Sequence, residues 1–261
     1  MKSISRIILV FIILSIPTVV RSAEFIWDRN MTPSGVGIGS LYMVGSIIDG
    51  DYDRFVSAIK KRGAKPFILY VRSGGGNVSE AMKIGRLVRQ LSLTVYAPLS
   101  TLQNMNTASC DADVGSVGKP VPCICASACT LIWFGGVMRI GLAVYIHSIK
   151  YNETYFGSLS PQQAQIMYQH AMQEVHTYLA EMDIDDKYYY MMVRTGSSEL
   201  QRASGHIGGD LGGWTPAYRE WLYAKCGAPV EGDTSPAWGM CTVNVGNQAE
   251  VEAIRKVLNS Q

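Results

Sequence analysis

Apolar positions in the first half of the chain follow two spacings, one typical of buried strands and one of amphipathic helices. Residues 66–72 form an almost unbroken apolar run, which predicts a strand buried on both faces of a parallel sheet. Residues 51–62 and 79–91 carry apolar side chains at helical spacing and predict two helices. Residues 36–48, where glycine alternates with apolar residues, and residues 94–97 predict two further strands.

The middle of the chain opens with a polar stretch. Residues 100–122 are rich in Gly, Asn and Asp, which predicts an inserted loop. Residues 126–134 then predict a buried helix, and residues 143–147 predict a buried strand.

Helical spacing dominates the C-terminal part. Residues 161–181 predict a long amphipathic helix, which residues 186–194 continue. Short helices are expected from Trp214-Thr215-Pro216 onward and over residues 248–258. The alternation of strands and helices along the whole chain predicts an α/β domain with a largely parallel sheet.

The N-terminus has the pattern of a secretory signal peptide. Lys2 and Arg6 precede an apolar run over residues 7–20, and small residues follow as far as residue 23. Cleavage after Ser22 is favoured, which predicts a periplasmic or secreted protein. The alternative is an uncleaved membrane anchor, for which the apolar run is short. We therefore divide the chain into a signal peptide (residues 1–23), one domain (24–225) and a C-terminal tail (226–261).

Composition narrows the possible partners. The chain is 48% hydrophobic and 17% charged, which is typical of a globular domain, and its formal net charge is +2. A charge so close to neutral gives no indication of a nucleic-acid partner.

The six cysteines are expected to form disulfides because an exported protein meets an oxidising environment. Cys226 and Cys241 stand apart from the others and are expected to pair, which would staple the tail. The other four allow three pairings between which the sequence does not choose, and their spacing does not favour a metal site. These four are Cys110, Cys123, Cys125 and Cys129.

Three short motifs have chemical potential. Residues 74–76 are consecutive glycines between an expected strand and helix, where backbone N–H groups can bind an anion. Ser127 lies among small residues at the expected first turn of a buried helix, and His147 ends an apolar strand. Taken alone, each also fits an ordinary structural role: a tight turn, an N-cap serine and a buried histidine.

Taken in this order along the chain, the motifs resemble the proteolytic subunit of the Clp protease and its relatives, whose fold is shared with crotonases and signal-peptide peptidases. The Gly-Gly-x-Val motif of the family matches residues 75–78, its serine motif matches residues 125–129 and its Ile-His motif matches residues 146–147. The long handle helix of the family matches residues 161–194. The likeness spans residues 36–225 and is greatest to exported relatives with a Cys-x-Ser-Ala-Cys core.

The resemblance implies a Clp protease/crotonase-like fold of repeated ββα units with a protruding handle helix. It also implies that Ser127 is the nucleophile and that His147 is the base. The N–H groups of Gly75 or Gly76 and of Ala128 would then hold the oxyanion.

The third catalytic residue of the family is an acid that follows the handle helix, and this chain has no clean match to it. Asp210 is the best placed, and Asp186 and Glu199 are weaker candidates. A Ser-His dyad without an acid is the alternative.

The expected function is therefore an exported serine peptidase that acts on a peptide or protein substrate without a cofactor or metal; the same site would suit an esterase. The alternatives are an inactive scaffold or binding protein, a crotonase-like acyl-CoA enzyme, and a Ser-Lys dyad that uses Lys83 or Lys150. The handle of the family is an assembly surface, which implies a homo-oligomer. Export argues against an ATPase partner.

Overall fold

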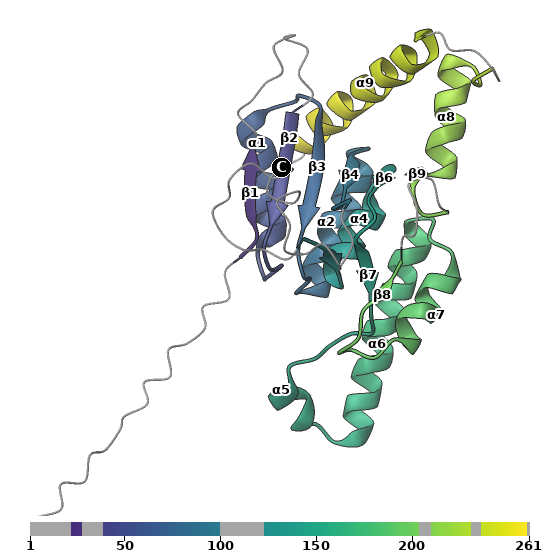
Figure 1. The fold of residues 1–261 in the computed structure, drawn as a ribbon. Helices are drawn as coiled ribbons and strands as arrows, with labels where there is room; N and C mark the ends of the chain where they lie inside the picture. Colours follow the sequence, from purple (N-terminus) through teal and green to yellow (C-terminus); the bar gives the residue numbers. More distant parts are fainter. Residues whose placement is uncertain (1–21, 28–38, 100–122, 204–209, 231–235, 260–261) are drawn as a thin grey trace, which may run out of the picture.

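The computed structural model describes residues 22–27, 39–99, 123–203, 210–230 and 236–259 (Figure 1). These residues form a mixed α/β fold in which strands and helices alternate along most of the chain. The expected signal peptide as far as residue 21 and the expected inserted loop lie outside the described residues.

The larger sheet within the described residues has a parallel centre and antiparallel edges. β2, β3, β4 and β6 run parallel, whereas β1 pairs antiparallel with β2, and β9 pairs antiparallel with β6. The prediction of a largely parallel sheet is therefore confirmed. In spatial order the strands are β1 (Glu24–Trp27), β2 (Gly39–Val44), β3 (Phe67–Arg72), β4 (Thr94–Tyr96), β6 (Met138–Ile140) and β9 (Gly213–Trp214).

A second, smaller sheet contains β5 (Cys125–Ala126), β7 (Val144–Ile146) and β8 (Gln201–Arg202). β5 runs parallel to β7, and β8 runs antiparallel to β7. Ser73, the residue after β3, attaches this sheet to the larger one. Its N–H donates to Ile124 O at 2.9 Å, and its carbonyl accepts from Ala126 N at 3.0 Å. The carboxyl ends of β3, β5 and β7 consequently meet, as is common at ligand sites in α/β proteins.

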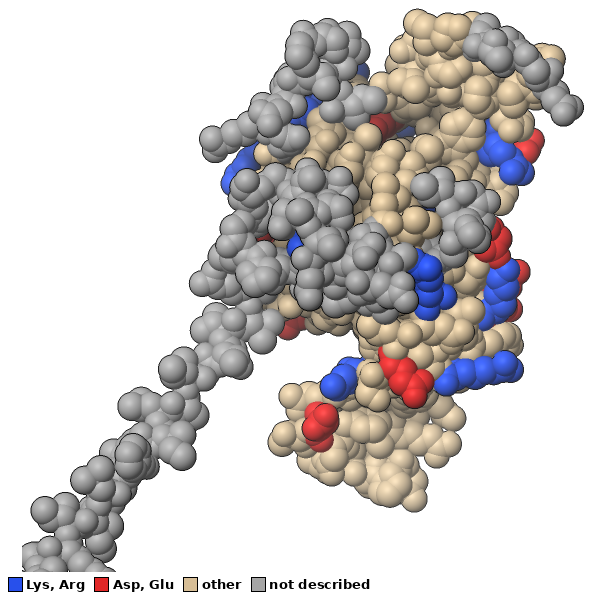
Figure 2. All heavy atoms as spheres, viewed as in Figure 1, with Lys and Arg blue, Asp and Glu red and all other residues tan. Residues whose placement is uncertain are grey.

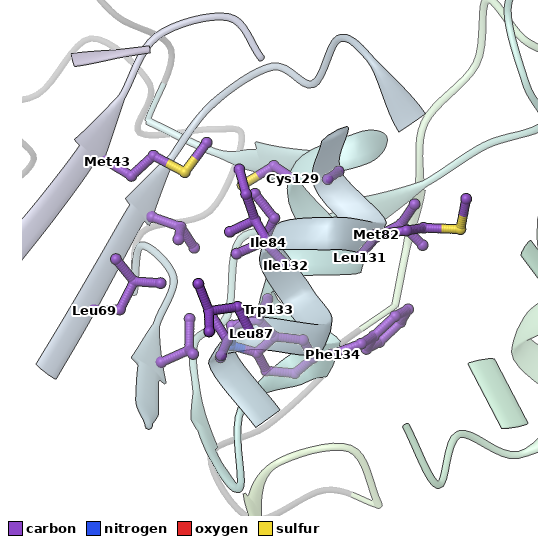
Figure 3. Close-up of a cluster of buried hydrophobic side chains, with 14 of the residues drawn as sticks. Met43, Leu69, Met82, Ile84, Leu87, Cys129, Leu131, Ile132, Trp133 and Phe134 are labelled. Carbon is purple, nitrogen blue, oxygen red and sulfur yellow. The ribbon is translucent and has the colours of Figure 1, made fainter. Parts of the chain in front are cut away.

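Helices α1 (Asp51–Arg62), α2 (Val78–Gln90) and α4 (Ala128–Gly135) share one apolar core with the larger sheet. α2 and α4 approach closely, because a Cβ on Gly135 would lie only 2.3 Å from Gly85 O. Figure 3 shows the side chains between them, which include Ile84, Leu87, Leu131, Ile132, Trp133 and Phe134.

Local signals fix where these helices begin. Asp51 is fully buried at the start of α1, where its carboxylate accepts from Ile48 N at 2.7 Å. Acidic residues lie in the first turn of α1 and basic residues in its last, which suits the helix dipole. Asn77 caps α2 by accepting from Glu80 N at 2.9 Å.

The long amphipathic helix is present as predicted: α6 (Pro161–Glu181) is followed by α7 (Asp186–Arg194). Ser160 begins α6 in a capping box, with Pro161 in the first turn. The buried side chains of α6 all lie in its second half, whereas Ile166 in the first half is 66% exposed. In Figure 1 the first half extends from the body together with α5 (Glu153–Gly157).

Several boundaries correct the sequence-based expectations. The buried helix expected from residue 126 begins at Ala128, because Cys125–Ala126 is a strand. The terminal helix α9 (Ala237–Asn259) is 23 residues long and begins well before residue 248. β1, β6, β8, β9 and α5 were not expected, since each is too short to show a period.

The tail packs on the domain. Cys226, which ends α8 (Pro216–Cys226), lies at disulfide distance from Cys241 of α9, as predicted, with a Cα–Cα separation of 5.8 Å. Ile254 and Val257 of α9 belong to the main core.

Of the remaining cysteines, Cys125 and Cys129 form a disulfide pair with a Cα–Cα separation of 5.2 Å. Cys123 is also disulfide-bonded, whereas Cys110 lies outside the described residues.

The described surface is mixed in charge. On the face in Figure 2, basic and acidic side chains are interspersed among uncharged residues. Within the described ranges, no helix is long and apolar enough to cross a membrane.

Candidate active site

A cavity of about 360 Å³ opens where the carboxyl ends of β3, β5 and β7 meet. The glycine loop, Ser127 and His147 all line it, so the structure brings the three sequence motifs together. Its polar or small lining residues are Gly74, Gly76, Ser127, Ala128, His147, Ser148, Lys150, Tyr151, Asn152 and Ser197. Its apolar wall consists of Val78, Leu131, Ile149, Met172, Val175 and Met192.

The glycine loop is held between two segments that leave no room for side chains. A Cβ on Gly76 would lie 2.0 Å from Ile47 O, and one on Gly75 would lie 2.6 Å from Ser127 Cβ. Both glycines also have positive φ, 108° for Gly75 and 140° for Gly76. The sequence therefore needs glycine here to bring the loop against Ser127.

Ser127 lies between β5 and α4 with φ 59° and ψ −127°. A positive φ is rare for a residue with a Cβ and costs about 1–3 kcal/mol, so it persists only where the surroundings impose it. The Ser127 side chain makes no capping hydrogen bond to α4. Its hydroxyl is therefore not used as an N-cap, which is the ordinary structural role of a serine at this position.

Backbone hydrogen bonds tie Ser127 to the strand that leads to His147. Ser127 N donates to Tyr145 O at 3.0 Å, and the Thr130 hydroxyl donates to the same carbonyl at 2.8 Å. Together with the Ser73 bonds, they place β5 between the glycine loop and β7.

His147 is half-buried, and its Nδ1 lies 2.5 Å from Ser148 O. Because a carbonyl oxygen accepts and cannot donate, Nδ1 is the donor in this bond, and in the neutral ring Nε2 is therefore an acceptor. Within the described part of the chain, no hydrogen bond joins Ser127 Oγ to this ring. Such bonds are often formed fully only once substrate is bound.

The structure shows which of the candidate oxyanion donors have a free N–H group. Gly75 N donates to Ser73 Oγ at 3.0 Å, so this expected donor is already occupied. The N–H groups of Gly76 and Ala128 donate to no other described residue, and both residues line the cavity. α2 begins at Val78 and α4 at Ala128, and both residues line the cavity, so the positive ends of two helix dipoles point toward it.

Asp210, the expected acid, is not brought to His147. It is exposed and pairs with Lys187, and it accepts from Tyr188 Oη at 2.7 Å. The hydrogen bonds from Lys187 and Tyr188 lower the pKa of Asp210. Asp210 does not line the cavity. The sequence placed it after the handle helix, but position along the chain does not show which way the carboxylate points.

The weaker acid candidates lie elsewhere too. Asp186 pairs with His176 at 2.9 Å, and Glu199, like Asp186, does not line the cavity. No acidic side chain of the described residues lines it.

The two candidate lysines are placed differently. Lys83 forms an ion pair with Glu80 on α2 at 2.8 Å and does not line the cavity, whereas Lys150 lines it. Of the other histidines, His170 lies near Glu174 on α6, and His206 lies outside the described residues.

Sequence reasoning missed the apolar wall and the role of the Ser148 carbonyl. Met172 and Val175 come from the buried face of α6 and Met192 from α7, and helical spacing alone does not show which cavity such a face surrounds. A backbone carbonyl has no signature in the sequence.

Comparison with models of known protein families and with curated proteins finds no match for this chain.

Proposed function

We propose that this protein is a serine hydrolase with a Clp protease/crotonase-like fold that cleaves peptide bonds through an acyl-enzyme. The observation that carries the proposal is the strained backbone of Ser127 at a strand-to-helix junction, in a cavity that His147 also lines. Strained turns of this kind present the nucleophile in other serine hydrolases.

In the proposed reaction, Ser127 Oγ forms a bond to the substrate carbonyl carbon while its proton passes to His147 Nε2. The carbonyl electron pair moves to oxygen, and the N–H groups of Gly76 and Ala128 hold this oxyanion. A donor of this kind contributes about 3–4 kcal/mol at the transition state. The C–N bond then breaks, and the amine leaves with the proton from His147. A water molecule that gives a proton to His147 then attacks the acyl ester, and the C–O bond to Ser127 breaks as His147 returns this proton to Ser127 Oγ.

The proposed pair works as a dyad. Ser148 O holds the Nδ1 proton of His147, which leaves Nε2 free to act as the base. A neutral carbonyl stabilises the imidazolium less than a carboxylate does, so we expect a slower enzyme than one with a full triad.

The cavity wall supports a substrate with an apolar side chain next to the scissile bond. Val78, Leu131, Met172, Val175 and Met192 form this wall, and methionine adapts to varied shapes. Lys150 is the charged residue among the lining side chains. An acidic substrate side chain next to the scissile bond would have to lose hydration against the apolar wall, at a high cost.

The signal-like N-terminus and the disulfide pairs support an exported site of action, periplasmic or secreted. A hydrolase in that location would work without an ATPase.

A Ser127–Lys150 dyad is the second candidate, because Lys150 lines the same cavity. It predicts loss of reactivity in Lys150→Met with little change in His147→Ala, and the histidine mechanism predicts the reverse. An inactive scaffold predicts no reactive serine at all.

The test is covalent labelling of the purified protein with a fluorophosphonate probe between pH 6 and 9, with the modified peptide mapped by mass spectrometry. We expect labelling at Ser127 that disappears in Ser127→Ala and falls sharply in His147→Ala. Ser57→Ala, an exposed serine on α1, is the matched control and should label as the wild type does. Absence of a Ser127 adduct across this range would refute the proposal.

A further inference from the structure

Ser127 lies at the centre of a loop that a disulfide closes. Cys125 in β5 is bonded to Cys129 in the first turn of α4, four residues later in the sequence. Both cysteines are completely buried, at 0% exposure. Figure 3 shows Cys129 among apolar side chains of the core, to which Met43 of β2 and Ile84 of α2 also belong.

Besides the close approach of Gly75, two backbone hydrogen bonds restrain the strained backbone at Ser127. Its N–H donates to Tyr145 O, and its carbonyl accepts from Thr130 N, both at 3.0 Å. Its side chain makes no hydrogen bond within the described residues. Each of these bonds holds one atom of a neighbouring peptide group, so they restrain φ only together with the chain on either side.

An unrestrained serine before a helix has a lower-energy alternative. With negative φ it becomes an ordinary N-cap, and its oxygen accepts from N–H groups of the first helical turn. In that arrangement Oγ would be engaged with α4 instead of free for the substrate. The disulfide joins the residues on both sides of Ser127 and so opposes this relaxation.

We infer that the Cys125–Cys129 disulfide is a positioning element that holds Ser127 in its reactive conformation, so that the site is completed only when this pair is oxidised. The inference rests on the proposed function of Ser127. In the oxidation step the two thiols lose two protons and two electrons to a disulfide-bearing oxidant, which is released as two thiols.

The burial of both sulfur atoms makes this step one-way. Thiolate attack on a disulfide requires access to a sulfur, and the folded protein denies that access. The protein would therefore be latent when made in a reducing compartment, become competent while folding in an oxidising one, and then resist reductant. Cys226–Cys241 in the tail, where both cysteines are only half-buried, is a natural comparison.

The test compares the full-length protein with Cys125→Ala/Cys129→Ala and with Cys226→Ala/Cys241→Ala as the matched control. The readouts are the fluorophosphonate labelling rate at Ser127, the far-UV circular dichroism spectrum and the hydrogen-exchange rate of the Ser127 amide. We expect the first variant to keep its spectrum, to label at least tenfold more slowly and to exchange that amide at least tenfold faster. The control should stay within twofold of the wild type in both rates.

Wild-type protein refolded with a phosphine reductant supplies a second arm, because it retains both sulfur atoms and creates no cavity. It should behave like the Cys125→Ala/Cys129→Ala variant, whereas reductant added after oxidative folding should leave labelling unchanged. Equal labelling and equal exchange in oxidised and reduced forms would overturn the inference and leave the proposed function standing. Global unfolding of both the reduced wild type and the Cys125→Ala/Cys129→Ala variant would also overturn it, because the cross-link would then hold the whole fold. If the oxidised protein does not label at all, the proposed function fails, and amide exchange still decides whether the disulfide positions Ser127.

Discussion

At the residue scale, the closest constraint on the proposed nucleophile is Gly75. A Cβ at this position would lie 2.6 Å from Ser127 Cβ and 3.0 Å from Ala126 O, and its φ is 108°. We expect Gly75→Ala to displace Ser127 and slow fluorophosphonate labelling about 100-fold, since small misplacements of reacting groups cost that much. Labelling kinetics measure the effect.

Gly74→Ala is the control for this substitution. A Cβ on Gly74 meets nothing within 4 Å, so the loop should accept it. Similar losses from both substitutions would mean that the loop as a whole, and not the contact with Ser127, is responsible.

A second residue-scale expectation concerns Asp210, which is bound to Lys187 and Tyr188 and not to His147. Removing the acid of a true triad lowers the rate by about 10⁴. We expect Asp210→Asn to change labelling by less than about threefold, because the backbone carbonyl of Ser148 sets the histidine tautomer. A fall in the labelling rate of several hundredfold would show that Asp210 acts as the acid after all.

These residues also show what the sequence can and cannot reveal about the site. Ser127 and His147 could be chosen because their residue types suit a nucleophile and a base, and because the order of the motifs carries the resemblance to the Clp protease subunit. The sequence could not show which of Gly75 and Gly76 offers a free N–H group, because this depends on which N–H group donates to the Ser73 hydroxyl. The partners of Asp210 could not be predicted either, because they lie on α7, and helical spacing does not show which carboxylate they contact.

At the scale of elements, the close contact between α2 and α4 sets the relative position of two helices whose first residues line the cavity. Gly85 on α2 allows Tyr178 of α6 to donate from its hydroxyl to Leu131 O at 2.6 Å. A Cβ on Gly85 would lie 1.8 Å from Tyr178 Oη and 3.0 Å from Leu131 O. We expect Gly85→Ala to lower the free energy of unfolding by about 1–3 kcal/mol, as overpacking does. Urea denaturation measures this change.

Gly239→Ala is the matched control on α9, where an added Cβ meets nothing within 4 Å. Because alanine favours helix more than glycine does, this control should be neutral or slightly stabilising. Equal destabilisation by both substitutions would contradict the proposed crowding at Gly85.

Elements with a strong local signal were predictable and those made by tertiary contacts were not. The periodic apolar residues of α1 predicted its bounds, Asp51–Arg62, and the amphipathic pattern of α6 predicted Pro161–Glu181. β6 and β9 exist because neighbouring strands supply their hydrogen bonds. The first half of α9 has weak helical spacing and two glycines, Gly239 and Gly246, so its start was placed too late.

At the scale of the whole molecule, Glu250 links the tail to the larger sheet. This side chain of α9 is 6% exposed, and one of its oxygens accepts from Phe67 N at 2.7 Å. Burial raises the pKa of Glu250 to about 8, although the Phe67 N–H and the charge of Arg62 oppose the rise. Glu250 lines a second cavity, separate from the candidate active site, that Tyr218 of α8 also lines. Burial raises the pKa of Tyr218 to about 12.

The raised pKa of Glu250 makes the attachment of the tail depend on pH. The ordinary pKa of glutamate is 4.5. Between that value and about 8, the unfolded chain releases the proton of Glu250 while the folded protein keeps it. The stabilisation is therefore complete below the lower value and is lost as the pH rises through the upper one. At about 1.4 kcal/mol per pKa unit, the loss is a few kcal/mol.

Glu250→Gln isolates this dependence, because the amide oxygen still accepts from Phe67 N but carries no proton to lose. We expect the free energy of unfolding of the wild type, from urea denaturation at pH 5, 6.5, 8 and 9, to fall relative to that of Glu250→Gln as the pH rises. The variant should be the more stable protein at pH 9. Glu252→Gln, an exposed neighbour on α9, controls for removing a charge from the helix and should follow the wild type. Parallel curves for wild type and Glu250→Gln would show that this carboxyl does not link folding to pH, and that the tail is held by Ile254, Val257 and the Cys226–Cys241 disulfide alone.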